Sequence, residues 1–181
     1  KYDLSATEAL QLLDYSIYFD LKKEPLPTDL DGILHYLTQE EIIVKQDNGL
    51  FAITNLGAIL FAKKLSDFSR LERKAIRVVQ YKDNSRLEML KEDVGNKGYA
   101  VGFDGLLKYV EALLPSKEVI EGAIRRKVLT YPSIALREAI ANALIHQDFS
   151  VTGSGVVIEI FSDRIEITNP GRPLVDVARI I

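Results

Sequence analysis

Three polar residues at a spacing of four, Glu138, Asn142 and His146, are the strongest candidates for chemistry in this sequence. On an α-helix each step of four advances about 40° around the axis and about 6 Å along it, so the three side chains would form one ridge. An asparagine carbonyl is an oxygen ligand that Mg²⁺ accepts, and a carboxylate can orient or deprotonate a water molecule. Glu138 and Asn142 therefore supply, from one helix face, two groups that nucleotide triphosphate hydrolysis needs. The same spacing also fits a solvated helix face with a surface amide, and spacing alone does not decide between the two.

Composition excludes several other chemistries. The 181 residues contain no cysteine, which rules out thiol catalysis, disulfides and thiolate metal sites. The two histidines, His35 and His146, lie far apart in the sequence, so a structural zinc site is not expected. No run approaches the roughly 18 apolar residues of a membrane span. With a net charge of −3, the chain has no overall field that draws it onto nucleic acid, and any DNA contact would be local.

The first part of the chain predicts a helix, a hairpin and a second helix in that order. Ser5 and Glu8 form a capping-box pattern before an apolar run, and Thr28 can cap a further helix after the break at Pro25 and Pro27. Asn48-Gly49 between two β-prone runs is a strong hairpin signal, and a helix is expected to start at Thr54 or Asn55. This order predicts a winged-helix-like module over residues 1–74.

The charge of this module argues against a role in reading DNA. Residues 1–75 contain nine basic and twelve acidic residues, whereas a helix that docks on phosphates should be basic. A structural or dimerising winged helix is therefore favoured. The helix before the hairpin carries Asp29, Asp31, Glu40 and Glu41, and the local basic candidates are Lys45, Lys63 and Lys64.

The second part predicts helices stacked on a mostly antiparallel sheet. Residues 83–98 are expected to be a loop or an irregular extended segment. On the helix that carries Glu138, the apolar residues Ile134, Ala141, Leu144 and Ile145 are expected to face the sheet. The expected elements are a strand at 75–81, a helix at 102–114, a strand at 123–131, a helix at 132–147, strands at 155–161 and 165–167, and a turn at 169–173.

The run LREAIANALIHQDFSVTGSGVVIEIFSDRIEITNPGRP resembles the C-terminal ATPase-like domain of bacterial transcriptional regulators and RecG-helicase-related proteins, which usually begin with a Schlafen/Alba-like DNA-binding domain. This pattern covers residues 132–173. The runs ITNLGAILFAKKLSDF and GYAVGFDGLLKYVEALLP extend the resemblance over most of the chain from about Leu30. The resemblance implies an α+β fold, in which the winged-helix-like module at 1–74 precedes an incomplete Bergerat-type α/β sandwich, the N-terminal part of a truncated GHKL-like ATPase domain at 75–181.

The same resemblance assigns roles to individual residues. Glu138 would be the general base and Asn142 the magnesium ligand. Apart from the resemblance, the position of His146 at the helix end suits contact with phosphate or, equally, stabilisation of the last carbonyls of its helix. Asn169 and Gly171 would occupy the place of the D-x-G-x-G box that binds adenine. Two departures weaken this match, because Asn169 replaces the aspartate and Pro173 replaces the last glycine.

The function implied is that of a cytoplasmic, bacterial transcriptional regulator with a nucleotide-binding, ATPase-like domain that controls DNA transactions. ATP and Mg²⁺ would act in the full-length protein. DNA would be bound through an N-terminal domain missing from this sequence. The chain itself is expected to form a homo-oligomer, and no association with a membrane is expected. Two alternatives stay open: a true Mg²⁺-dependent ATPase in the full-length protein, or a degenerate nucleotide fold used for oligomerisation. Because a second glycine-rich box does not occur before Ile181, this chain is expected to bind ATP weakly or not at all.

Overall fold

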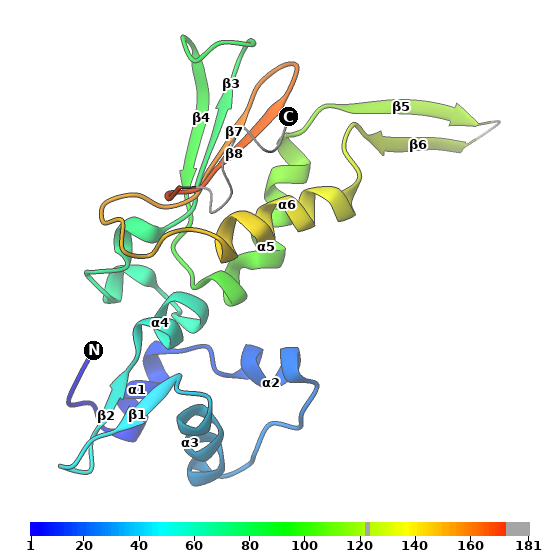
Figure 1. The fold of residues 1–181 in the computed structure, drawn as a ribbon. Coiled ribbons are helices and arrows are strands. Elements are labelled where there is room, and N and C mark those ends of the chain that lie inside the picture. The colour runs from blue at the N-terminus through cyan, green and yellow to red at the C-terminus, as the bar shows by residue number, and fades with distance from the viewer. Residues whose placement is uncertain (122–123, 173–181) are drawn as a thin grey trace. The chain divides into compact units, whose positions relative to one another are not determined.

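The computed structural model describes residues 1–121 and 124–172 and shows a mixed α+β architecture, as predicted (Figure 1). The chain divides into two compact units. The first comprises residues 1–75 and 95–104, and the second comprises residues 76–94 and 105–181. Within the described ranges, no helix has the length and apolar character needed to cross a membrane.

The first unit contains four α-helices and one hairpin. The capping box at Ser5 starts the first helix, since the Glu8 amide donates to Ser5 Oγ over 3.3 Å and the Ser5 amide donates to Glu8 Oε2 over 2.8 Å. The predicted cap at Thr28 is wrong, because the Gly32 amide donates to Asp29 Oδ1 over 2.6 Å and Asp29 is the N-cap. The elements are α1 (Ala6–Leu12), α2 (Ser16–Lys22), α3 (Leu30–Gln39), β1 (Ile43–Lys45), β2 (Phe51–Ile53) and α4 (Asn55–Phe61).

The hairpin forms where Asn48-Gly49 predicts it. Strands β1 and β2 pair antiparallel, Gly49 has a φ of +80°, and the Asn48 side chain accepts a hydrogen bond from the Leu50 amide. Leu4 forms an isolated antiparallel bridge to β2, because it exchanges two backbone hydrogen bonds with Phe51. The predicted order of helix, hairpin and helix is therefore present, and α4 starts after its N-cap Thr54.

The second unit is built on a four-stranded sheet in the order β4–β3–β7–β8. Strands β3 and β7 are parallel and the other two pairs are antiparallel, which agrees with the mostly antiparallel sheet expected from the sequence. Ile158 and Ile160 of β7 are buried, as are Val110 of α5 and Ile140 of α6. The elements are β3 (Arg77–Tyr81), β4 (Met89–Val94), α5 (Tyr99–Leu113), α6 (Ser133–Ile145), β7 (Val157–Ile160) and β8 (Ile165–Thr168), and the start of α5, up to Asp104, belongs to the first unit.

Two strands of this unit differ from the sequence prediction. The segment 83–98, expected to be irregular, contains β4, every residue of which is exposed. A strand expected at 123–131 is β6 (Ile124–Leu129), and it pairs with the unpredicted β5 (Ser116–Glu121) as a separate two-stranded sheet. Ala123 lies outside the described residues.

The buried face of α6 differs in part from the predicted one, since Leu144 is buried as expected and Ala141 is half-buried. Its buried residues are Leu136, Ile140, Ala143 and Leu144, at spacings of four, three and one, which form a single stripe along a helix. Ile134 and Ile145 are 78% and 69% exposed, so the expectation that they face the sheet is wrong. The face of α6 opposite the buried stripe is thus open along the length of the helix.

Candidate functional site

The predicted ridge on α6 exists. Glu138 and Asn142 are both exposed, and Asn142 Nδ2 lies 3.3 Å from Glu138 Oε1, within hydrogen-bond distance. The amide therefore donates through its nitrogen, and its oxygen Oδ1 is the atom that a cation would take. The structure thus places a carboxylate and an amide oxygen side by side on an open helix face.

His146 marks the end of this helix. It is the C-cap residue, and its backbone amide donates to the carbonyl of Asn142 over 2.9 Å. Its ring is exposed at the end of the ridge, about 12 Å along the axis from Glu138. Both roles predicted for it, contact with phosphate and interaction with the last carbonyls of the helix, remain predictions.

The turn that contains Asn169 and Gly171 lies against the segment that follows α6. The Asp148 amide donates to the Pro170 carbonyl over 2.8 Å. Gly171 has a φ of +132°, and a Cβ atom built on it would lie 3.1 Å from the Cβ of Asp148. The structure therefore brings the turn to the end of the helix that carries the ridge. Pro173, the last residue of the predicted turn, lies outside the described residues.

Asp148 is the residue of this region that sequence reasoning missed. Besides its bond to Pro170, its carboxylate accepts from the Ser150 amide over 2.8 Å and from the Ser150 hydroxyl over 2.6 Å. An aspartate two residues before a serine is a recognisable turn signal, because the carboxylate can bond the backbone two positions on. The sequence Asp148-Phe149-Ser150 therefore carried the information that a fixed turn follows α6.

A network of charged groups fixes the strand that leads into the turn. Arg86, in the loop between β3 and β4, donates to both carboxylate oxygens of Glu159 on β7 over 2.7 and 2.8 Å and to Glu166 on β8 over 2.6 Å. The hydrogen bond from Arg86 holds the pKa of Glu159 below its ordinary value, and the hydroxyl of Tyr81 acts in the same direction, although partial burial opposes both. Sequence reasoning could not find this network, since Arg86 lies more than 70 residues from either carboxylate.

A second arginine joins the same network. Arg164 donates to Glu166 over 2.6 Å and to the Asn84 carbonyl over 3.0 Å, so it ties the β3–β4 loop to β8. Its guanidinium lies 3.9 Å from the ring centroid of Phe161, which stacks on Tyr81. The loop and the β7–β8 hairpin are therefore held together by ionic and aromatic contacts.

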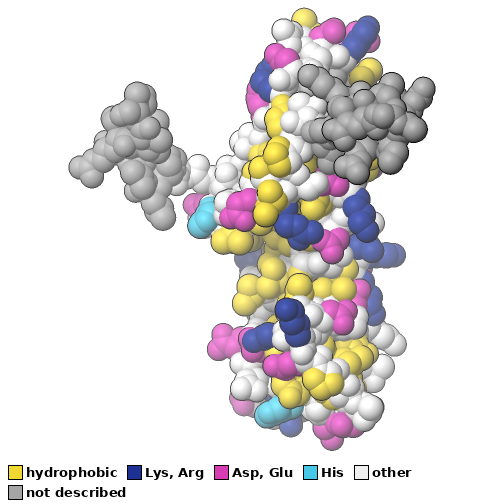
Figure 2. Space-filling model, turned by 90° about the vertical axis from the view of Figure 1, so that its right-hand side faces the viewer, with side chains coloured by type: hydrophobic (Ala, Val, Ile, Leu, Met, Phe, Trp, Pro, Cys, Tyr) yellow, Lys and Arg dark blue, Asp and Glu magenta, His cyan; other side chains and the backbone are white. Residues whose placement is uncertain are grey.

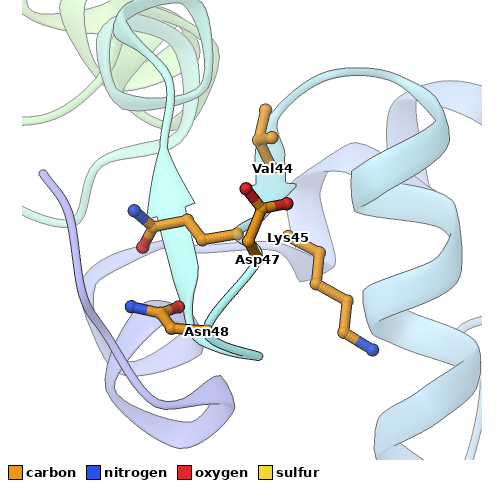
Figure 3. A pocket seen from close by; sticks show the side chains of 5 residues that line it. Val44, Lys45, Asp47 and Asn48 are labelled. Atoms are coloured by element: carbon orange, nitrogen blue, oxygen red, sulfur yellow. The ribbon is translucent and has the colours of Figure 1, made fainter.

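A surface hollow of about 480 Å³ lies in the first unit, at the turn between β1 and β2 (Figure 3). None of the predicted site residues lines it. Two of its lining side chains hold the N-terminal segment, since Gln46 Oε1 accepts from the Asp3 amide and Asn48 donates to the Asp3 carboxylate. These amides therefore have a structural role. The hollow is lined by Val44, Lys45, Gln46, Asp47 and Asn48.

Among the described residues, histidine, aspartate and glutamate side chains do not gather in any group of three that could hold a metal ion. A site formed by Asn142 would instead combine one amide oxygen with the oxygens of a bound phosphate and of water. Such sparse protein ligation is usual for Mg²⁺ at nucleotide sites.

Comparison with known proteins gives a fold relationship. Neither the family models nor the curated proteins include a match to this chain. A solved structure that is similar is that of the DIP2311 protein from Corynebacterium diphtheriae, with a TM-score of 0.62 and 20% sequence identity over 91% of this chain. At that identity the similarity shows a shared fold. The chain spans about a third of the length of the DIP2311 protein, 32%.

Proposed function

We propose that the second unit is the nucleotide-binding, ATPase-like module of a bacterial transcriptional regulator, and that its ligand is ATP with Mg²⁺. The observation that supports this proposal is the contact between Glu138 and Asn142 on the open face of α6. The hydrogen bond from Asp148 to Pro170, which holds the turn at the end of that helix, adds to it.

Each residue has a role in this proposal. Asn142 Oδ1 would ligate the magnesium ion, and Glu138 would orient a water molecule toward the phosphate chain. Asn169 and Gly171 would bind the adenine edge, where the neutral amide of Asn169 can accept a hydrogen bond but brings no charge. ATP bound with Mg²⁺ supplies a phosphoryl group that water can attack.

In this proposal DNA is contacted by a domain outside these residues. The first unit has an excess of acidic residues over residues 1–75. On the face shown in Figure 2, basic and acidic side chains are interspersed with hydrophobic ones among the coloured residues. A surface with mixed charges gives little counterion release on binding duplex DNA. A gel shift with this chain should therefore show weak binding, and tight, salt-sensitive binding would contradict this assignment.

The test of nucleotide binding is NMR of the ¹⁵N-labelled chain with millimolar ATP, with and without Mg²⁺. We expect weak, Mg²⁺-dependent shifts in the signals of α6 and of the turn at Asn169 and Gly171. Asn142→Ala should remove the Mg²⁺ dependence, and Asn55→Ala, which deletes an exposed amide at the start of α4, should leave it unchanged. Shifts that do not depend on Mg²⁺ or on Asn142 would refute the proposal.

A catalytic role for Glu138 rests on the same contact, in which its exposed carboxylate lies beside the amide. Phosphate release in the presence of Mg²⁺ and ATP measures it. If the module is an ATPase, Glu138→Gln should abolish turnover while the Mg²⁺-dependent NMR shifts remain. If ATP binds but no phosphate is released, the module is a nucleotide-binding domain without ATPase activity.

A further inference from the structure

Strands β5 and β6 form a hairpin that is separate from the four-stranded sheet (Figure 1). They connect α5 to α6, and six residue pairs align from Ser116 opposite Leu129 to Glu121 opposite Ile124. The base is fixed by Thr130, whose amide and hydroxyl both donate to the Pro115 carbonyl, over 3.3 and 2.6 Å. In the part of the chain that the structure describes, the second edge of β5 has no strand beside it.

The open edge of β5 can accept a further strand. Two isolated strands are marginally stable in water, and stability requires at least a third strand or a packed face. An unpaired edge also presents a row of free backbone donors and acceptors to any available strand. The open edge of β5 is therefore a place where a further strand can pair.

The two edges of the hairpin differ in charge. Strand β6 carries three successive cations, Arg125, Arg126 and Lys127, and runs of charge of this kind protect an edge from pairing. Antiparallel pairing of β6 with β6 of a second copy, centred on Arg126, would place cations opposite cations. Strand β5 carries charges of both signs, Lys117, Glu118 and Glu121, of which Lys117 and Glu121 lie four residues apart on one face.

We propose that β5 pairs antiparallel with β5 of a second copy of this chain, in the register centred on Val119. In that register Lys117 of each chain lies opposite Glu121 of the other, which gives two symmetric pairs of opposite charge. The result is a four-stranded sheet in the order β6–β5–β5–β6, with the cationic β6 strands at its outer edges. This inference does not depend on nucleotide binding.

The pairing inside the hairpin supports this register. Lys117 aligns with Val128 and Glu121 aligns with Ile124, so neither charge has an oppositely charged residue directly across from it within its own hairpin. If Lys117 and Glu121 are exchanged, each still lies opposite an apolar residue within its own hairpin. A charge swap therefore tests the pairing between two copies.

The first experiment measures the dimer dissociation constant of the whole chain by sedimentation equilibrium. Lys117→Glu and Glu121→Lys should each weaken the dimer at least about tenfold, because two like-charge contacts replace two attractive ones. The double variant K117E/E121K should restore it. Lys45→Glu, a matched charge change in β1, should have no effect. Circular dichroism shows that each variant is folded.

The second experiment uses the absence of cysteine in the chain. Val119 lies on the two-fold axis of the proposed dimer, where opposed Cα atoms are within the range that a disulfide spans. Val119→Cys should therefore oxidise to a covalent dimer, while Val128→Cys on β6 should remain monomeric on denaturing gels. The proposal is overturned if the wild-type chain stays monomeric, if the double swap fails to restore the dimer, or if both cysteine variants cross-link equally.

Discussion

Removal of the Arg86 guanidinium should loosen the β7–β8 hairpin specifically. The side chain of Glu159 is only 12% exposed and receives two hydrogen bonds from Arg86, which also bonds Glu166. Among the described residues, Arg86→Ala would leave Glu159 with the Tyr81 hydroxyl, at 3.2 Å, as its remaining side-chain donor. A partly buried carboxylate that loses its cation costs more than an exposed ion pair and less than a fully buried one.

The magnitude follows from the exposure of the two partners. Arg86 is itself 56% exposed, so solvent screens the pair, and the loss arises mainly at the partly buried Glu159 carboxylate. We expect amide hydrogen exchange in β7 and β8 to become about tenfold faster. Native-state exchange followed by NMR is the assay, because it reports each unit of the chain separately.

The control is Lys82→Ala in the same loop. Lys82 pairs with Glu88, and both side chains are more than half exposed, at 54% and 59%. This pair should contribute less than about 0.5 kcal/mol, so exchange in β7 and β8 should change little. Equal effects of Arg86→Ala and Lys82→Ala would show that the partial burial of Glu159 has no energetic consequence, and the reasoning would be refuted.

Three further predictions concern backbone space and pH. Gly57→Ala should destabilise the first unit by more than about 2 kcal/mol in thermal unfolding, because the added Cβ overlaps the Ile42 carbonyl oxygen. Gly105→Ala, with open space around it in α5, should stabilise the protein by about 0.5–1 kcal/mol. A Gly57→Ala variant that is more stable than Gly105→Ala would contradict both expectations. The pKa of Glu159 is held below its ordinary 4.5, so its stabilisation is present above that pH and lost as the pH falls through the lowered value; urea titrations should show this loss, and Glu159→Gln should reduce it. Gly171→Ala should shift NMR signals around the turn, because alanine at this position would be strained by the φ of +132°. An unchanged spectrum would count against a fixed turn.

Local sequence signals predicted the elements whose ends are set by local chemistry. Ser5 with Glu8, Asn48-Gly49 and Thr54 each bond backbone groups within three residues, so the sequence pattern contains both partners. The helix expected at 132–147 is α6, Ser133–Ile145, for a similar reason: Pro132 precedes its first turn, and His146 closes its last.

Elements that depend on distant partners could not be predicted in this way. Strand β4 has no alternation of apolar and polar residues, and its pairing with β3 includes the ion pair between Arg77 and Glu92, fifteen residues apart. The wrong assignment of Ile134 and Ile145 has a related cause. Nearly every turn of α6 carries an apolar residue on more than one side, so periodicity alone did not select the stripe that includes Leu136 and Ile140.

The two parts of the candidate site are joined by separate supports within the second unit. On one side, the bond from Asp148 to Pro170 ties the turn to the end of α6, which itself lies against β8. On the other side, Arg86 joins β7 to β8, the strand that runs directly into the turn. Each support limits the distance between the ridge and the turn. Loss of Arg86 removes one support and leaves α6 unchanged. It should therefore disturb the turn, while the hydrogen bond from Asn142 to Glu138 should survive in that variant.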